Sequence, residues 1–104
     1  MTESEKVAYL KRRQGILEVL ESLLGSWDLA DGLIALIGSE FVTLEAIDGV
    51  EKILRDSIKS VKDIQLQEKL RESADKIHDL RAMEMKELSN EKNQAEQMIF
   101  KNFI

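Results

Sequence analysis

The chain contains no cysteine and no proline, only five aromatic residues, and no glycine after Gly49. Without cysteine it has neither a disulfide nor a thiolate metal site. Strands favour β-branched and aromatic residues, whereas the abundant Leu, Glu and Lys favour helices, so the composition predicts an all-α fold. Because glycine and proline are the usual helix breakers, their absence after residue 49 predicts an almost unbroken helix through the second half.

Long hydrophobic runs are also missing. The most apolar run, Leu33 to Ile37, has five residues, whereas a helix needs about 20 to cross a bilayer. The first residues, Met1 to Lys6, lack the basic segment and apolar stretch of a secretion signal. We therefore expect no membrane-spanning segment and a cytoplasmic location. At 104 residues, residues 1–104 should form a single helical domain, with a compact acidic half (1–49) and a long charged half (50–104).

The net charge of −5 lies entirely in the first half. Residues 1–49 carry four basic and nine acidic residues, and residues 50–104 carry eleven of each. Between Arg13 and Lys52 there is no Lys or Arg, against eight Asp or Glu. Any surface that this stretch exposes is therefore acidic.

Apolar spacing predicts three helices in the first sixty residues. The first runs from about Glu5 to Leu24, with Val7, Leu10, Leu17, Leu20 and Leu24 on one stripe and Ile16, Val19 and Leu23 beside it. Gly25 ends it, and Ser26 can cap a short helix from Trp27 to Ile37. Thr43 can cap a third helix, whose apolar positions follow a three-to-four spacing: Ile47, Val50, Leu54, Ile58, Val61 and Ile64.

A change of helical phase divides the second half. The stripe that ends at Ile64 and the one that begins at Leu66 lie about 200° apart on a helical wheel, which predicts a corner at residues 60–63. Ser89-Asn90 is a weaker candidate interruption, because Ser and Asn compete for backbone hydrogen bonds. Two architectures stay open: the last helix projects from the body, or it folds back as a hairpin.

No motif for catalysis, cofactor binding or metal binding emerges. His78 is the single histidine, and Asp75-x-x-His78 lacks the second such pair and the further carboxylates of a di-iron bundle. The stretch from Asp28 to Gly32 lacks the alternate oxygen ligands of a calcium loop. The glycines form no phosphate-binding pattern. We expect no enzyme activity, cofactor, metal or small-molecule substrate.

Nucleic-acid binding is the alternative that the sequence leaves open. The short helix, the Gly38 turn and the helix from Thr43 resemble a helix-turn-helix in outline, but Glu45, Asp48 and Glu51 would face the phosphates. Lys11, Arg12 and Arg13 form the only basic cluster, which we expect to be a solvated helix face. Mimicry of DNA by the acidic half is the other branch of this alternative.

These features favour a non-enzymatic protein-interaction module: an adaptor, an inhibitor or an oligomeric scaffold built on coiled-coil-like amphipathic faces. Its partner would be another protein, a second copy of the chain, or both. Trp27 is either a core residue or a binding anchor. The predicted partner-binding residues are Trp27, Leu66, Leu70, Ile77 and Leu88, with a second patch at Met98, Ile99, Phe100 and Phe103.

Overall fold

Four helices make up the fold in the computed structural model, which describes the backbone of residues 2–103 and the side chains of residues 2–90. They are α1 (Glu3–Glu21), α2 (Ala30–Ile37), α3 (Leu44–Ile58) and α4 (Ile64–Phe103). No strand occurs among the described residues, so the all-α prediction is confirmed. No helix in this part of the chain combines the length and apolarity needed to cross a bilayer.

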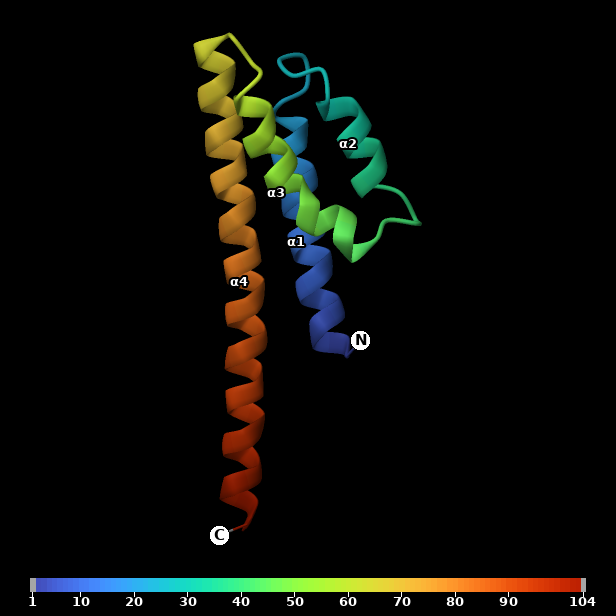
Figure 1. Ribbon diagram of the computed structural model, residues 1–104. Helices are drawn as coiled ribbons and strands as arrows, with labels where there is room; N and C mark the ends of the chain where they lie inside the picture. The colour runs from blue at the N-terminus through green and yellow to red at the C-terminus, as the bar shows by residue number, and fades with distance from the viewer. Residues whose placement is uncertain (1, 104) are drawn as a thin grey trace.

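The helices alternate in direction, and α4 is the common support (Figure 1). It packs against α1 and α3, whereas α2 packs on α1 and touches α3. Helix α4 is continuous: it neither folds back nor breaks at Ser89-Asn90, and it runs past the N-terminal end of α1 (Figure 1). The radius of gyration is 17.1 Å, against about 13 Å for a compact domain of 100 residues. Of the two predicted architectures, the projecting helix is therefore the one that the structure adopts.

One apolar core joins all four helices. Of the predicted third stripe, Ile58 and Val61 are half-buried and Ile64 is exposed, whereas Ile47, Val50 and Leu54 are fully buried. These side chains meet the buried residues of α4, and residues from α1, the following turn and α2 complete the cluster. The members of the core are Ile16, Leu20, Leu23, Trp27, Ala30, Leu33, Ile37, Ile47, Val50, Leu54, Leu70, Ala74 and Ile77.

The buried face of α1 differs from the predicted stripe. Val7, Leu10 and Leu24 are exposed, while Ala8 and Arg12 are buried together with Ile16 and Leu20. The physical reason is close packing against α4: a Cβ added at Gly15 would lie 2.8 Å from Leu80 Cδ1. Small residues let two helices approach, and that contact, together with the apolar residues, helps to set the rotation of α1.

The turns partly follow the sequence prediction. Thr43 caps α3 as predicted, its hydroxyl accepting a hydrogen bond from the backbone N–H of Ala46 at 3.1 Å. Ser26 does not cap α2. The chain instead passes through Gly25 at φ +80°, and α2 begins three residues later than predicted, at Ala30 without a side-chain cap.

The corner predicted at residues 60–63 is confirmed. Helix α3 ends at Ile58 and α4 begins at Ile64. Asp63 caps α4, because its Oδ1 accepts hydrogen bonds from the backbone N–H groups of Gln65 at 2.9 Å and Leu66 at 3.4 Å. The phase change between the two apolar stripes thus coincides with a real reversal of direction.

Candidate protein-binding surface

The amphipathic face of α4 that was predicted to bind a partner packs against other helices of the same chain. Leu70 and Ile77 are buried in the bundle core, and so is Trp27. Leu66 and Leu88 are half-buried. Burial corrects the expectation that this face is free, because a partner could reach Leu70, Ile77 or Trp27 only by displacing α1 or α3. Met98, Ile99, Phe100 and Phe103 lie outside the residues whose side chains the structure describes.

The basic cluster on α1 is not the solvated face that the sequence predicts. Arg12 is only 4% exposed, and its Nη2 lies 2.7 Å from Asp48 Oδ1 on α3. Arg13 is half-buried and donates from Nε to the carbonyl of Ile37 at 2.7 Å. Lys11 alone stays well exposed, 3.8 Å from Glu87. Two of the three cations are therefore bound within the chain, which leaves little free positive charge here for phosphates.

Arg13 holds the connection between α2 and α3 in place. Besides its bond to the carbonyl of Ile37, its Nη2 donates to the carbonyl of Ser39 at 3.0 Å. Both acceptors lie at the C-terminal end of α2, where the helix dipole favours a cation. The loop of residues 38–43 is thereby tied to α1, and the loop includes Phe41.

Phe41 is the most exposed large apolar side chain among the described residues, at 88%. Three leucines of the same region are also exposed: Leu29 at the N-cap of α2, Leu36 on α2, and Leu44 at the start of α3. Leu29 and Leu36 are seven residues apart, so they lie on the same side of the helix. Exposed aromatic and apolar residues gathered in one region mark interaction sites more often than scattered ones do.

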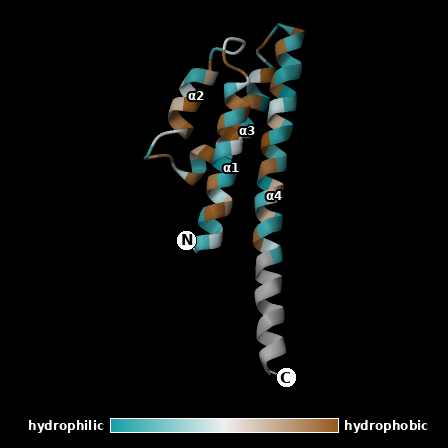
Figure 2. Ribbon diagram, turned by 180° about the vertical axis from the view of Figure 1, so that it is seen from behind, coloured by the Kyte–Doolittle hydropathy of each residue, from teal (hydrophilic) through white to brown (hydrophobic). Residues whose placement is uncertain are grey.

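Helix α2 has an unusual composition for a surface helix. Of its eight residues only Asp31 is charged, and Figure 2 shows hydrophobic residues along it. A helix that is apolar on all sides is normally covered on all sides. Here only Ala30, Leu33 and Ile37 are buried, and the opposite side, with Gly32 and Ala35, is open.

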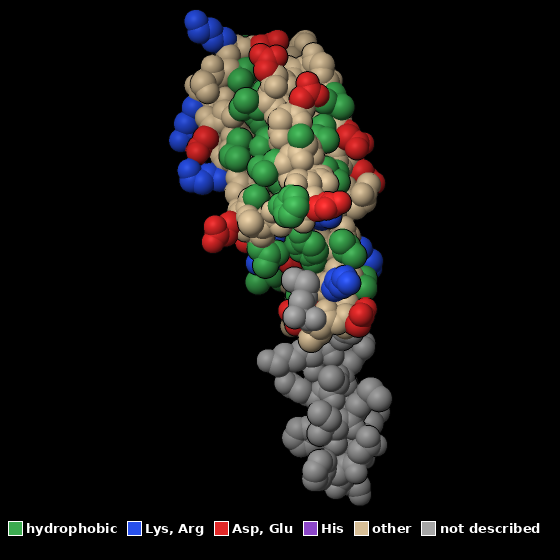
Figure 3. All heavy atoms as spheres, turned by 90° about the vertical axis from the view of Figure 1, so that its right-hand side faces the viewer, with side chains coloured by type: hydrophobic (Ala, Val, Ile, Leu, Met, Phe, Trp, Pro, Cys, Tyr) green, Lys and Arg blue, Asp and Glu red, His purple; other side chains and the backbone are tan. Residues whose placement is uncertain are grey.

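Acidic side chains surround these exposed residues. Asp28, Asp31, Glu40 and Glu45 are all exposed, and none forms an ion pair within the described part of the chain. Asp31 and Glu45 lie in the first turns of α2 and α3, where the helix dipole accounts for a carboxylate. On the side of the molecule toward α2, Figure 3 shows hydrophobic side chains in the middle, acidic ones around them, and Lys or Arg side chains along one edge.

We use the name α2–α3 surface for this region. It comprises Leu29, Leu36, Phe41 and Leu44 with the carboxylates of Asp28, Asp31, Glu40 and Glu45. The sequence reveals the acidic stretch but not these apolar residues, because leucines on α2 look like core residues until the packing of α2 is known. One feature of the sequence could have revealed them: the segment that forms α2 has more apolar residues than a helix with one buried face needs.

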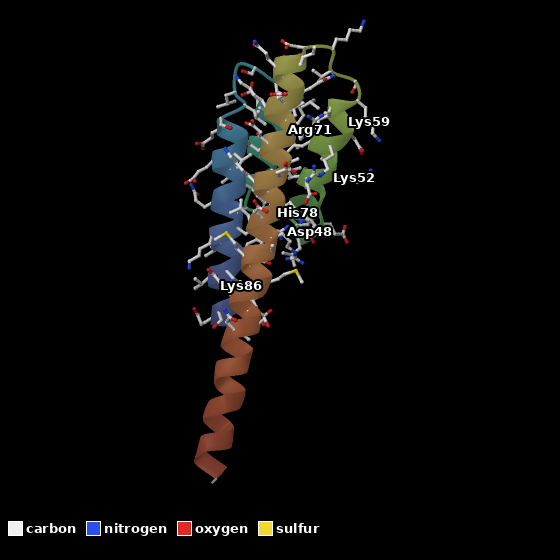
Figure 4. The ribbon with its side chains drawn as sticks, turned by 90° about the vertical axis from the view of Figure 1, so that its left-hand side faces the viewer. Asp48, Lys52, Lys59, Arg71, His78 and Lys86 are labelled. Carbon is white, nitrogen blue, oxygen red and sulfur yellow. The ribbon has the colours of Figure 1, made fainter. Side chains whose placement is uncertain are left out.

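An ionic network joins α3 to α4 on the other side of the molecule (Figure 4). Arg55 pairs with Glu51 at 2.9 Å and with Asp75 at 3.0 Å, and His78 Nδ1 lies 3.2 Å from Glu51 Oε1. The hydrogen bond from Arg55 is the main cause of a lowered pKa of Glu51, with a smaller contribution from His78. Among the described residues no group of three His, Asp or Glu is arranged to hold a metal ion. The ion pairs of this network link α3 to α4 at the surface of the protein.

Hollows lie along the contact between α1 and α4 in the described part of the chain. One, of about 390 Å³, is an open groove whose lining includes Gly15, Val19 and Leu80, and another, of about 290 Å³, is lined by Val7 and Leu88 among others. A smaller hollow, of about 60 Å³, is lined by Arg12 and Glu84 among others. Arg12 Nε and Nη1 and Glu84 Oε2 are buried without a hydrogen-bond partner among the described residues. The volume of the smaller hollow exceeds the ~10–15 Å³ that one water molecule needs.

Comparison of the chain with protein-family models, with curated proteins and with solved structures found no match.

Proposed function

We propose that this protein is a non-enzymatic protein-interaction module, acting as an adaptor, an inhibitor or a scaffold, and that it binds its partner through the α2–α3 surface. The observation that carries the proposal is Phe41, 88% exposed on a loop that Arg13 ties to α1. Because the backbone of this loop is already held by these hydrogen bonds, less of the loop has to be ordered on binding, which favours Phe41 as an interface anchor. Full burial of one such side chain contributes about 1.5–3 kcal/mol.

The ordinary alternative is that these residues are merely scattered surface hydrophobics, which every soluble protein has. Their arrangement argues against it. Leu29 and Leu36 share one side of α2, Phe41 follows only five residues after Leu36, and Leu44 begins the next helix. The remaining side of α2 offers Gly32 and Ala35, which are too small to shield the leucines from water.

Photo-crosslinking tests the proposal directly. A benzophenone amino acid replaces Phe41, and a matched protein carries the same group at Lys59, an exposed residue at the far end of α3. We expect position 41 to give a discrete crosslinked adduct with a partner protein, and position 59 to give none. The adduct should disappear when Leu36→Asp is added, because a carboxylate would enter the apolar centre of the surface. Equal adducts from both positions, or none from position 41, would refute the proposal.

Acidic mimicry of DNA is the second candidate, and the unpaired carboxylates of the α2–α3 surface favour it. DNA carries one charge per about 1.7 Å along its axis, whereas here the carboxylates stand around an apolar centre. A mimic should release a DNA-binding protein from duplex DNA. Its effect should survive Phe41→Ser but weaken when Asp31→Asn and Glu40→Gln are combined, which is the reverse of what the protein-interaction proposal predicts.

A further inference from the structure

We infer that the partner of the α2–α3 surface is a basic amphipathic helix, that is, a segment with an apolar stripe bordered by Lys and Arg. The inference rests on the proposed function and adds the chemical class of the partner. Three arguments from the described residues support it: the mode of recognition that the surface allows, the shape of α2, and the charge around α2.

Helix recognition is the mode for which the surface is suited. A partner strand needs a free sheet edge to extend, and the described residues contain no strand. A proline-rich segment needs a groove lined by several aromatic residues, and Phe41 is the one exposed aromatic side chain in this region. An amphipathic helix can pack its apolar stripe against another helix that offers apolar side chains at helical spacing, as Leu29 and Leu36 do.

The shape of α2 also fits a helical partner. Leu29 and Leu36 stand about 10 Å apart along the helix axis, seven residues at 1.5 Å each. Between them Gly32 is exposed, and a Cβ added there would meet nothing within 4 Å. A small residue between two large ones leaves a shallow depression in which a side chain of a crossing helix can sit. Phe41 then lies beyond the C-terminal end of α2, where it can cover one edge of the partner.

Charge decides which amphipathic helix fits. Asp28, Asp31, Glu40 and Glu45 border the apolar residues, and none of them forms an ion pair with another described residue. A partner bordered by carboxylates would place like charges together, which is unfavourable. A second copy of this chain faces the same difficulty, because a two-fold interface would set this surface against itself. Lys and Arg at the border of the partner stripe are complementary.

Synthetic peptides test the partner class. The probe is a peptide of about 18 residues, or five helical turns, with Leu at positions i, i+3, i+4 and i+7 and Lys elsewhere. One control has the same residues shuffled so that no stripe remains, and the other has Glu in place of Lys. We expect the striped Lys peptide to bind at least about tenfold more tightly than either control, and its affinity to fall as salt is raised.

Two glycine variants locate the binding. Gly32→Gln fills the depression between the leucines, while Gly49→Gln adds the same side chain on α3, where a Cβ also meets nothing within 4 Å. Both replacements exchange a helical glycine for a better helix former, so both should raise the thermal midpoint rather than lower it. We expect Gly32→Gln to weaken binding of the striped Lys peptide about tenfold or more, and Gly49→Gln to leave it unchanged.

The outcomes separate this inference from the proposed function. Equal binding of the shuffled peptide, or full binding by Gly32→Gln, overturns the inference. So does an adduct at position 41 in which the crosslinked segment is acidic, is not helical, or belongs to a second copy of this chain, although the protein-interaction function then stands. If position 41 yields no adduct in the crosslinking experiment, the proposed function fails first and the inference fails with it.

Discussion

Breaking the buried Arg12–Asp48 pair should destabilise the protein unequally, depending on which partner is removed. Arg12 is 4% exposed and Asp48 is 49% exposed, and Arg12 Nη2 lies 2.7 Å from Asp48 Oδ1. Removing the carboxylate with Asp48→Ala leaves a cation buried without its partner. Removing the cation with Arg12→Met leaves a carboxylate that water already reaches, and Met fills similar space with an unbranched apolar chain.

The magnitudes follow from these exposures. Leaving one member of a fully buried pair without its partner costs about 3–5 kcal/mol. Asp48 is half-exposed, and Glu84 lines the same small hollow as Arg12, so we expect a smaller loss of about 2–3 kcal/mol for Asp48→Ala. Replacing a buried charge by an apolar residue is often nearly neutral, so Arg12→Met should change the free energy of unfolding by about 1 kcal/mol or less.

Urea unfolding followed by helical circular dichroism measures both changes. For a domain of this size a loss of 2–3 kcal/mol lowers the thermal midpoint by about 10–20 °C. Asp75→Ala is the control, because it removes a carboxylate from an exposed pair with Arg55, where the expected cost is about 0–1 kcal/mol. The reasoning is refuted if Arg12→Met costs as much as Asp48→Ala, or if Asp48→Ala costs no more than the control.

Three further predictions concern the turns and the α3–α4 network. Gly25→Ala should cost about 1–2 kcal/mol in the free energy of unfolding, because φ is +80° at Gly25 and a side chain is strained there even though a Cβ would meet nothing within 4 Å; an unchanged urea midpoint would contradict it. Thr43→Ala removes the cap of α3 and should cost about 1 kcal/mol, with Thr43→Ser restoring most of it. The pKa of Glu51 is lowered from 4.5, mainly by the hydrogen bond from Arg55. Its contribution to stability is therefore present above pH 4.5 and is lost as the pH falls through the lowered value, so unfolding of wild type and Glu51→Gln should differ near neutral pH and converge in acid.

Local signals determined most of the secondary structure. The lack of proline and late glycine, the phase change at residues 60–63 and the apolar spacing of α3 correctly predicted an all-α chain, a corner and a buried stripe. These features depend on neighbours along the chain, so the sequence contains them. Ser26 is the instructive exception: its side chain suits a helix cap, but the backbone uses Gly25 for the turn and α2 starts later.

The candidate site depended on contacts between distant residues. Arg12 and Arg13 look like any exposed basic pair until α3 brings Asp48 to the first and α2 brings its terminal carbonyls to the second. Leu70 and Ile77 form an apolar stripe whatever covers it, and the stripe cannot show whether the cover is another chain or, as here, α1 and α3. Such choices are made by packing, which single-residue preferences do not record.

The sequence by itself therefore determined the helical class, the corner before α4 and the excess of negative charge between Arg13 and Lys52, because propensity, periodicity and charge are properties of the residues themselves. Only the tertiary structure decided that α4 stays continuous, that the predicted binding stripe is internal, and that Phe41 and the outer leucines of α2 are exposed. The reason is geometric: the close approach of α1 to α4 at Gly15 helps to set which helix faces meet, and an apolar face becomes a surface only when no other helix covers it.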